Sequence, residues 1–162
     1  MEHLYAPWRA AYFADRPKGC VFCAISQNPD RDRENQVLFR DQDCFIVMNR
    51  YPYTPGHFMI IPHLHLDALE ALDPKVWQRM SHLAQRGTAL LKNHFKAHGV
   101  NLGMNLGQSA GAGIAEHIHL HLVPRFERDT NFITTVGDAR VNGVAFERIY
   151  ENLLGASRDF FD

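Results

Sequence analysis

The sequence predicts an α+β domain in which two amphipathic helices pack against a mostly antiparallel sheet. Three observations favour this class: short β-rich runs separated by turns, one long central segment with helical periodicity, and a second helical segment near the C-terminus. The chain has 162 residues, a usual length for one domain. We therefore expect one domain over 1–162, with an N-terminal loop segment (1–35), a core (36–126) and a C-terminal extension (127–162).

The predicted strands come first along the core. The runs QVLFRD and CFIVMNR, separated by polar residues, predict a β-hairpin, and HFMIIP predicts a third strand. After the central helix, VNLGMNLG predicts a fourth strand and HIHLHLV a fifth. The expected order is therefore strand, strand, strand, helix, strand, strand, helix.

The two helices have clear boundary signals. Asp73 followed by Pro74 is a typical helix start, because Asp caps the first amides and Pro fits the first helical position. Apolar residues at helical spacing carry this helix to about Ala97, with Gly99 as its stop. The segment GVAFERIYENLLG predicts the C-terminal helix, whereas the proline and charge of 1–35 predict irregular structure.

Composition and charge limit the partners of the chain. Its formal net charge is -1, so no basic field draws it to nucleic acid or to an anionic membrane, and we expect neither partner. The start MEHLYAPWRA lacks the pattern of a secretory signal, and no apolar run approaches the roughly 20 residues of a membrane helix. Cys20, Cys23 and Cys44 are a poor disulfide framework. These features predict a soluble cytoplasmic protein.

The segment HIHLHLV places a histidine at every second position. In a strand, residues two apart share a face, so we expect the apolar residues in the core and the histidines on an accessible face. Metal binding by neighbouring histidines and plain surface histidines are alternatives to catalysis. Imidazole titrates near neutrality, can be a nucleophile and can donate to a phosphate. The preceding loop NLGQSAGAG offers amides that an anion could approach, although a simple glycine-rich turn is the alternative.

These residues resemble the histidine triad (HIT) family, in which three histidines alternate with apolar residues. HIHLHLV fits that pattern at every position, and NRYPYTPGHFMIIP, the glycine loop and the long helix extend the resemblance over about 36–126. LYAPWR and DTNFIT resemble the branch that contains bacterial diadenosine tetraphosphate phosphorylases and related hydrolases. The resemblance implies a HIT-like α+β fold with one long central helix and a C-terminal helix.

The resemblance also implies an enzyme that cleaves a nucleotide at its α-phosphate through a nucleotidyl-histidine intermediate. His119, the central histidine, would be the nucleophile, and His121 would stabilise the phosphate charge. His57 matches a family histidine that supports the third triad residue, with a plain strand-start histidine as the alternative. Asn49 matches a position that holds the ribose hydroxyls, with a turn residue as the alternative.

The glycine loop supplies the remaining expected substrate contacts. Family members commonly carry Gln and Ser or Thr before the first triad histidine, but this chain has Gly-Ile-Ala there. Ser109 or the backbone amides of Gly111 to Gly113 would substitute for them. The expected contacts in this loop are Asn105, Ser109, Gly111 and Gly113.

The segment GCVFC places Cys20 and Cys23 at a spacing that lets both thiolates reach one tetrahedral zinc. One such pair is half a site. The family pattern implies that His117 and His65, with His63 as a neighbouring alternative, complete a structural Cys₂His₂ zinc site. Two small buried thiols without a metal are the alternative.

We expect a nucleotide substrate, with a dinucleoside polyphosphate of the diadenosine tetraphosphate type as the leading choice. A nucleoside phosphoramidate hydrolase and a slow-turnover nucleotide-binding sensor are the alternatives. Water as acceptor would give a hydrolase and phosphate a phosphorylase, which the branch resemblance favours, with Arg50 and Arg125 as candidate phosphate donors. The family also implies a homodimer, for which Trp77, Leu91 and Phe95 would supply apolar surface on the long helix.

Overall fold

The computed structural model describes residues 19–127, 129, 136 and 143–161. The segment LYAPWR, and DTNFIT after its first residue, lie outside the described residues. None of the helices in the described ranges has the length and apolar character that crossing a bilayer requires.

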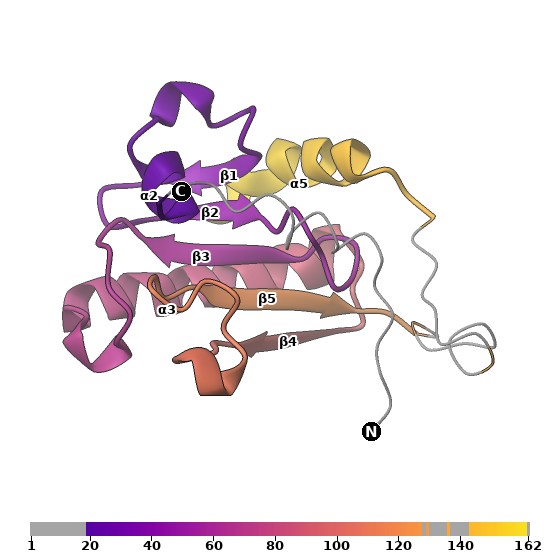
Figure 1. Cartoon of the computed structure of the whole chain (residues 1–162). Coiled ribbons are helices and arrows are strands. Elements are labelled where there is room, and N and C mark those ends of the chain that lie inside the picture. The colour runs from indigo at the N-terminus through magenta and orange to yellow at the C-terminus, as the bar shows by residue number, and fades with distance from the viewer. Residues whose placement is uncertain (1–18, 128, 130–135, 137–142, 162) are drawn as a thin grey trace.

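One antiparallel sheet forms the centre of the fold (Figure 1). Its strands are β1 (Val37–Arg40), β2 (Cys44–Met48), β3 (Phe58–Pro62), β4 (Gly99–Gly103) and β5 (Leu120–Arg125). Their order is β1-β2-β3-β5-β4, and each neighbouring pair is antiparallel. The predicted hairpin is β1 with β2, and the predicted α+β class is confirmed.

Helix α3 (Pro74–Ala89) begins where predicted, because the Asp73 carboxylate accepts a hydrogen bond of 2.8 Å from the amide of Lys75. The chain then forms a π-helical turn, η4 (Leu90–His94), so the helical segment ends before the predicted Ala97. Helix α5 (Phe146–Phe161) is the predicted C-terminal helix.

The prediction of irregular structure before residue 36 is wrong for α2 (Val21–Ser26), which is followed by the 3₁₀ turn η2 (Pro29–Arg31). A helix this short is unstable alone, and two tertiary contacts explain it. Phe22 is buried against the sheet, and Arg40 of β1 donates hydrogen bonds of 3.0 Å to the carbonyls of Ile25 and Ser26. A cation at these last carbonyls stabilises the C-terminus of the helix.

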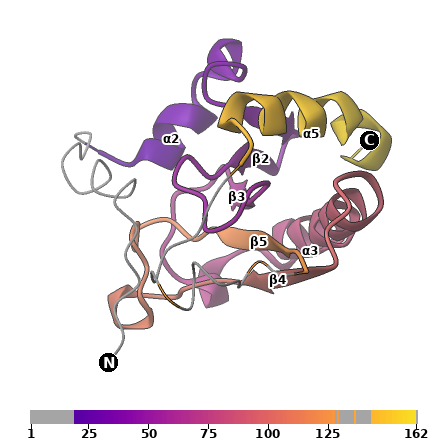
Figure 2. The ribbon, with the colours of Figure 1, turned by 90° about the vertical axis from the view of Figure 1, so that its right-hand side faces the viewer.

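The two faces of the sheet have different covers. Because side chains alternate along a strand, Cys44, Ile46 and Met48 of β2 belong to the core that α3 and α5 cover. Phe45 and Val47 belong to a second cluster, which contains Phe22 of α2 and which we call the α2-side cluster. Figure 2 shows α2 on one side of the sheet and α3 with α5 on the other. As predicted, the apolar residues between the histidines are buried in the core: Ile118, Leu120 and Leu122.

Helix α3 approaches the sheet closely at Gly87. A Cβ atom there would lie 3.0 Å from both Leu122 Cδ2 and Phe58 Cζ, which is tighter than ordinary contact. Glycine therefore permits this approach. Phe58 and Leu122 directly follow His57 and His121 in the chain, so the contact supports the backbone of both histidines from the helix side.

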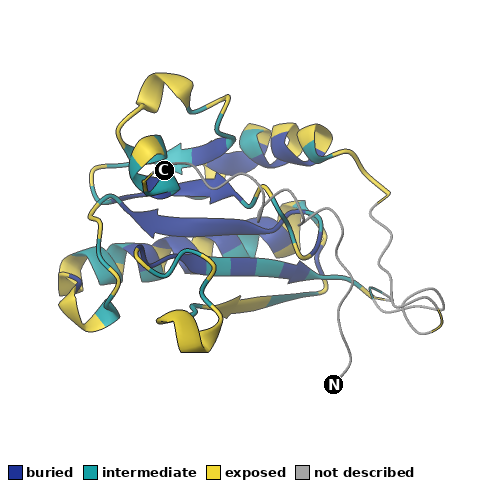
Figure 3. Cartoon of the chain, in the orientation of Figure 1, coloured by how far each residue is buried: buried dark blue, intermediate teal, exposed yellow. Residues whose placement is uncertain are grey.

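The apolar residues of the long helix that were predicted to contact a second copy of the chain pack against the core of the same chain. Leu91 is fully buried, and Trp77 and Phe95 pack against the core. The expectation is wrong for Leu91, which the π-helical turn directs inward, whereas Trp77 and Phe95 stay partly exposed and Phe95 contacts Phe126 with a ring separation of 5.9 Å. The edge strand β4 is instead exposed along much of its length, including Leu102 (Figure 3).

Candidate active site

The triad segment is only partly a strand, because β5 begins at Leu120 and His117 and His119 precede it. Its side chains nevertheless alternate as predicted. The expectation of an accessible histidine face is wrong for two of the three. His117 is 0% exposed and His119 7% exposed, whereas His121 is half-buried. Helix α2 covers this face, which sequence periodicity did not reveal.

One hydrogen bond assigns the protonation of the central histidine. Nδ1 of His119 lies 2.8 Å from the backbone oxygen of His117. A carbonyl oxygen can only accept, so Nδ1 carries the hydrogen and the neutral ring keeps a lone pair on Nε2. Burial lowers the pKa of His119, although the bond to the His117 carbonyl acts in the opposite direction. The site therefore favours a neutral imidazole with a nucleophilic Nε2.

A series of three hydrogen-bonded groups assigns the protonation of the His57 and His121 rings. The backbone amide of Tyr53 donates to Nδ1 of His57 over 3.2 Å, so the neutral His57 ring carries its hydrogen on Nε2. That atom donates to Nδ1 of His121 over 2.9 Å. His121 is then the tautomer with a hydrogen on Nε2, a donor suited to a phosphate oxygen. The Tyr53 ring stacks on His57 with a centroid separation of 5.0 Å and an interplanar angle of 18°.

The turn between β2 and β3 carries His57 and Asn49. The Asn49 side chain accepts from the amide of Tyr51 over 2.9 Å, as the turn interpretation predicts, and its Nδ2 lies 3.3 Å from Nδ1 of His57. Sequence reasoning missed Thr54, a buried residue whose hydroxyl donates to the backbone oxygen of Pro124 over 2.7 Å. The sequence offered one signal for this bond, namely a hydroxyl side chain inside a short turn that contains proline. This bond ties the turn to β5.

The glycine loop that precedes the triad is exposed and internally bonded. The predicted contacts in it are half-buried or exposed: Asn105, Ser109, Gly111 and Gly113. None of these four forms a hydrogen bond with a triad histidine within the described part of the chain. The amide of Gly111 donates to the oxygen of Gln108, and that of Ala112 to the oxygen of Gly107. Two of the three amides proposed to bind phosphate are therefore used within the loop.

Arg125, a predicted phosphate donor, is engaged elsewhere. Its guanidinium forms a 2.5 Å ion pair with Asp129 and donates to Oδ1 of Asn101 over 3.0 Å. Arg50 lies exposed at the end of β2, next to Asn49.

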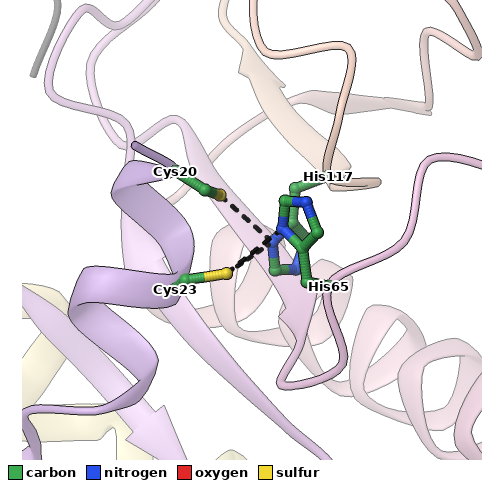
Figure 4. Close-up of side chains that lie close together, drawn as sticks. All are labelled: Cys20, Cys23, His65 and His117. Atoms are coloured by element: carbon green, nitrogen blue, oxygen red, sulfur yellow. Dashed lines mark hydrogen bonds between the residues drawn. The ribbon is translucent and has the colours of Figure 1, made fainter. Parts of the chain in front are cut away.

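The four predicted metal ligands lie together (Figure 4). One ligand atom from each of them lies within 4.8 Å of all the others: Cys20, Cys23, His65 and His117. Sγ of Cys20 is 3.3 Å from Nδ1 of His117, and Sγ of Cys23 is 3.2 Å from Nδ1 of His65. Tetrahedral zinc with its usual bond lengths separates its ligand atoms by about 3.3 to 3.8 Å, so the Cys20–His117 distance lies at the edge of this range and the Cys23–His65 distance about 0.1 Å below it.

The orientation of His117 also fits a metal. Its Nε2 lies 3.0 Å from the backbone oxygen of Pro62, so Nε2 carries the hydrogen and the lone pair of Nδ1 points toward the two thiols. Burial lowers the pKa of His117, which favours the neutral ring that binds metals. His63 lies apart from this group, because its Nδ1 is 2.7 Å from the Ser26 hydroxyl and its Nε2 3.0 Å from the Asp41 carbonyl.

The five strands form one antiparallel sheet, and three histidines alternate with apolar residues along the segment that leads into β5. This arrangement is that of the histidine triad class. The family model of the HIT domain matches residues 30–128, more than half of the chain, and the chain belongs to this family.

The comparisons include named enzymes. The chain is 36% identical over 151 residues to AP-4-A phosphorylase of Mycobacterium tuberculosis, covering 87% of this chain and 76% of that protein. It is 27% identical over 97 residues to bis(5'-adenosyl)-triphosphatase of Dictyostelium discoideum, covering 60% and 64%. A crystal structure of a Zn-bound histidine triad family protein from Mycobacterium smegmatis has a TM-score of 0.70 and 28% identity, covering 87% and 94%. The chain is an enzyme of the HIT family.

Proposed function

We propose that this enzyme cleaves dinucleoside polyphosphates such as diadenosine tetraphosphate by transferring a nucleotidyl group to His119. The observation that carries the proposal is the hydrogen bond from Nδ1 of His119 to the His117 carbonyl, which leaves Nε2 as the nucleophile. The 36% identical relative named AP-4-A phosphorylase supports the choice of substrate.

The chemistry at His119 takes two balanced steps. The lone pair of Nε2 attacks the α-phosphorus, a P–N bond forms, and the P–O bond to the leaving nucleoside polyphosphate breaks, its oxygen keeping the electron pair. An oxygen of water or phosphate then attacks the same phosphorus, and the P–N bond breaks with its electron pair returning to Nε2 of the neutral ring. Where water attacks, its proton is released to solvent. In both steps the Nε2 hydrogen of His121, held there by His57, donates to the phosphate oxygens and stabilises the developing charge.

The nucleophile has a direct test. Wild-type protein mixed with diadenosine tetraphosphate and quenched in denaturant should carry an adenylyl adduct on a peptide that contains His119, as measured by mass spectrometry. His119→Asn should lack the adduct and lose activity by orders of magnitude while it still binds nucleotide. An active His119→Ala variant would overturn the assignment.

We infer that phosphate is the acceptor, because a 36% identical relative that matches 87% of this chain is named AP-4-A phosphorylase. Products identify the acceptor. ADP plus ATP that appear only with added phosphate indicate phosphorolysis, whereas AMP plus ATP regardless of phosphate indicate hydrolysis. Adenosine phosphoramidate in the same panel tests the alternative substrate, and binding without turnover of any compound would favour the sensor.

We also propose one structural zinc ion on Cys20, Cys23, His65 and His117. The distances and the lone-pair direction of His117 support it, as does the likeness to a protein described as Zn-bound. Bound zinc would hold the two thiolates and two imidazoles in one closed tetrahedron and tie α2 to the sheet. Reduced thiols of this kind are typical of the cytoplasm, the location that we propose.

Elemental analysis tests the zinc site. Protein purified without added metal should contain about one zinc ion per chain. His65→Ala should lose the metal, and the matched variant His63→Ala, two residues away, should keep it. A metal-free wild type whose Cys20 and Cys23 both react with a thiol reagent while folded would overturn the proposal.

We propose a homodimer built on the exposed edge of the sheet. β4 is an edge strand of the sheet, and an edge strand can pair with a strand of another chain. Its Leu102 is 53% exposed and offers apolar surface there. Sedimentation should give twice the chain mass, and Leu102→Asp should shift the protein toward monomer. A wild-type monomer at micromolar concentration would refute the dimer.

A further inference from the structure

The C-x₂-C segment holds an aromatic residue that lies against the triad. Phe22 sits between Cys20 and Cys23 in α2 and is 3% exposed. Its ring centroid is 5.1 Å from that of His119, tilted by 53°, and 5.5 Å from that of His117, edge-on at 84°. The same short helix and its N-cap residue therefore carry one side chain toward His119 and two thiols toward His65 and His117.

His119 has two ring neighbours. His121 lies with its centroid 4.8 Å away at 76°, and Phe22 is the second ring. The bond from Nδ1 to the His117 carbonyl holds one point of the imidazole. The terminal torsion of histidine has broad energy wells, so one hydrogen bond alone allows the ring to swing about that point. Packing against Phe22 limits this swing and thereby fixes the direction of the Nε2 lone pair.

We propose that Phe22 is a positioning residue, which holds the His119 imidazole for attack and makes turnover depend on the closed Cys and His cluster that anchors α2. The proposal rests on the proposed function of His119. The helix α2 has 6 residues, too few to be stable without its contacts to the rest of the fold. Arg40 holds the C-terminal end of α2, whereas the cluster holds the N-terminal end that carries Phe22, so opening the cluster would loosen that end and withdraw the ring from the nucleophile.

A purely structural role is the competing explanation, and Ile25 provides a matched control. Ile25 lies on the same helix, packs against the same α2-side cluster and offers no ring to the imidazole. Phe22→Ala and Ile25→Ala both remove apolar volume from α2. Only the first removes the contact with His119.

The kinetic experiment compares kcat and KM of these variants on diadenosine tetraphosphate. Phe22→Ala should lower kcat about 10- to 100-fold with KM little changed, because a misdirected nucleophile binds substrate normally but attacks rarely. Phe22→Leu, which restores much of the volume, should recover part of kcat. Ile25→Ala should retain kcat within about threefold. Equal losses in Phe22→Ala and Ile25→Ala, or a loss in KM alone, would overturn the proposal.

A second measurement needs no substrate. Long-range ¹H–¹⁵N spectra report which ring nitrogen of His119 carries the hydrogen. Wild type should show the Nδ1–H form, and Phe22→Ala should show a mixture of the two tautomers, because the freed ring no longer holds its bond to the carbonyl. Identical spectra for the two proteins would overturn the proposal. If wild type fails to turn over diadenosine tetraphosphate, the proposed substrate is wrong and the spectra still decide the role of Phe22.

The coupling to the cluster is tested by a double-mutant cycle. Replacing both Cys20 and Cys23 with Ser opens the cluster. In the wild-type background this change should lower kcat about tenfold or more, whereas in the Phe22→Ala background it should lower kcat less than about threefold, since the ring is already absent. Losses that simply multiply would show that the cluster does not act through Phe22, and would overturn the coupling.

Discussion

His57→Leu removes the donor that fixes the tautomer of His121. In the folded chain, Nε2 of His57 donates to Nδ1 of His121 over 2.9 Å, and His57 itself is fully buried. Leucine cannot donate, so Nδ1 of His121 loses this hydrogen bond. The ring can then move its hydrogen to Nδ1, which leaves Nε2 without a hydrogen to donate to the phosphate.

The structure sets the size of the effect. Loss of one hydrogen bond that leaves a polar group unpaired costs about 1 to 3 kcal/mol, and half-buried His121 lies at the lower end because water can reach it. About 1 to 2 kcal/mol corresponds to a decrease in kcat of about 5- to 30-fold. His57→Gln should recover part of the loss, because its carboxamide NH₂ can donate from a similar place.

Steady-state kinetics on diadenosine tetraphosphate with saturating phosphate measures this effect. Thr54→Val is the control, since it removes a 2.7 Å hydrogen bond that ties the same turn to β5 and leaves the His57 ring intact. It should lower stability by about 1 kcal/mol with a much smaller change in kcat. The reasoning is refuted if His57→Leu turns over within twofold of wild type, or if His57→Gln is as slow as His57→Leu.

Three further predictions concern the scaffold. Gly87→Ala should lower Tm by up to about 8 °C, because overpacking costs about 1 to 3 kcal/mol and helix propensity offsets only about 1 kcal/mol of it. Gly155→Ala, where a Cβ meets nothing within 4 Å, should raise Tm by about 2 to 4 °C through helix propensity alone, and scanning calorimetry on both variants checks the opposite signs. Cys44 should resist alkylation until the chain unfolds, because burial raises the pKa of its thiol to about 12. Burial raises the pKa of Asp41, but the hydrogen bonds from Arg79 and from two backbone amides outweigh it, so the pKa of the folded state is lowered overall. The stability that this carboxylate contributes is therefore present above the pKa of the unfolded state and is lost as pH falls through the lowered pKa of the folded state. Asp41→Asn should flatten the acid unfolding curve in that pH range.

The sequence could predict the features that depend on local period. The position of the strands along the chain and the burial of Ile118, Leu120 and Leu122 follow from local pattern and a period of two, which neighbouring residues show without knowledge of the rest of the chain. The start of α3 at Asp73 likewise rests on neighbouring residues. Family resemblance, rather than spacing, selected His65 over His63 for the cluster that the structure brings together.

The features that sequence could not predict depend on distant contacts. Helix α2 exists because Arg40 and the sheet hold it, and its own residues carry little helical signal. The burial of His117 and His119 depends on that helix, which lies about ninety residues earlier in the chain. Leu91 looked available because a regular helix was extrapolated through a segment that forms a π-helical turn. Each of these misses arises where tertiary packing overrides local pattern.

One face of the sheet is covered by α3 and α5 and the other by α2. This division determines where residues can be inserted or deleted. His121 and Leu122 point to opposite faces, so deleting or inserting one residue within β5 before His121 would exchange this imidazole with a core leucine. The same holds for β3, where Met59 and Ile60 belong to different clusters. Single-residue insertions and deletions should therefore be confined to connecting segments. The exposed glycine loop at 105–113 is the place where a library of length variants should find the tolerated ones.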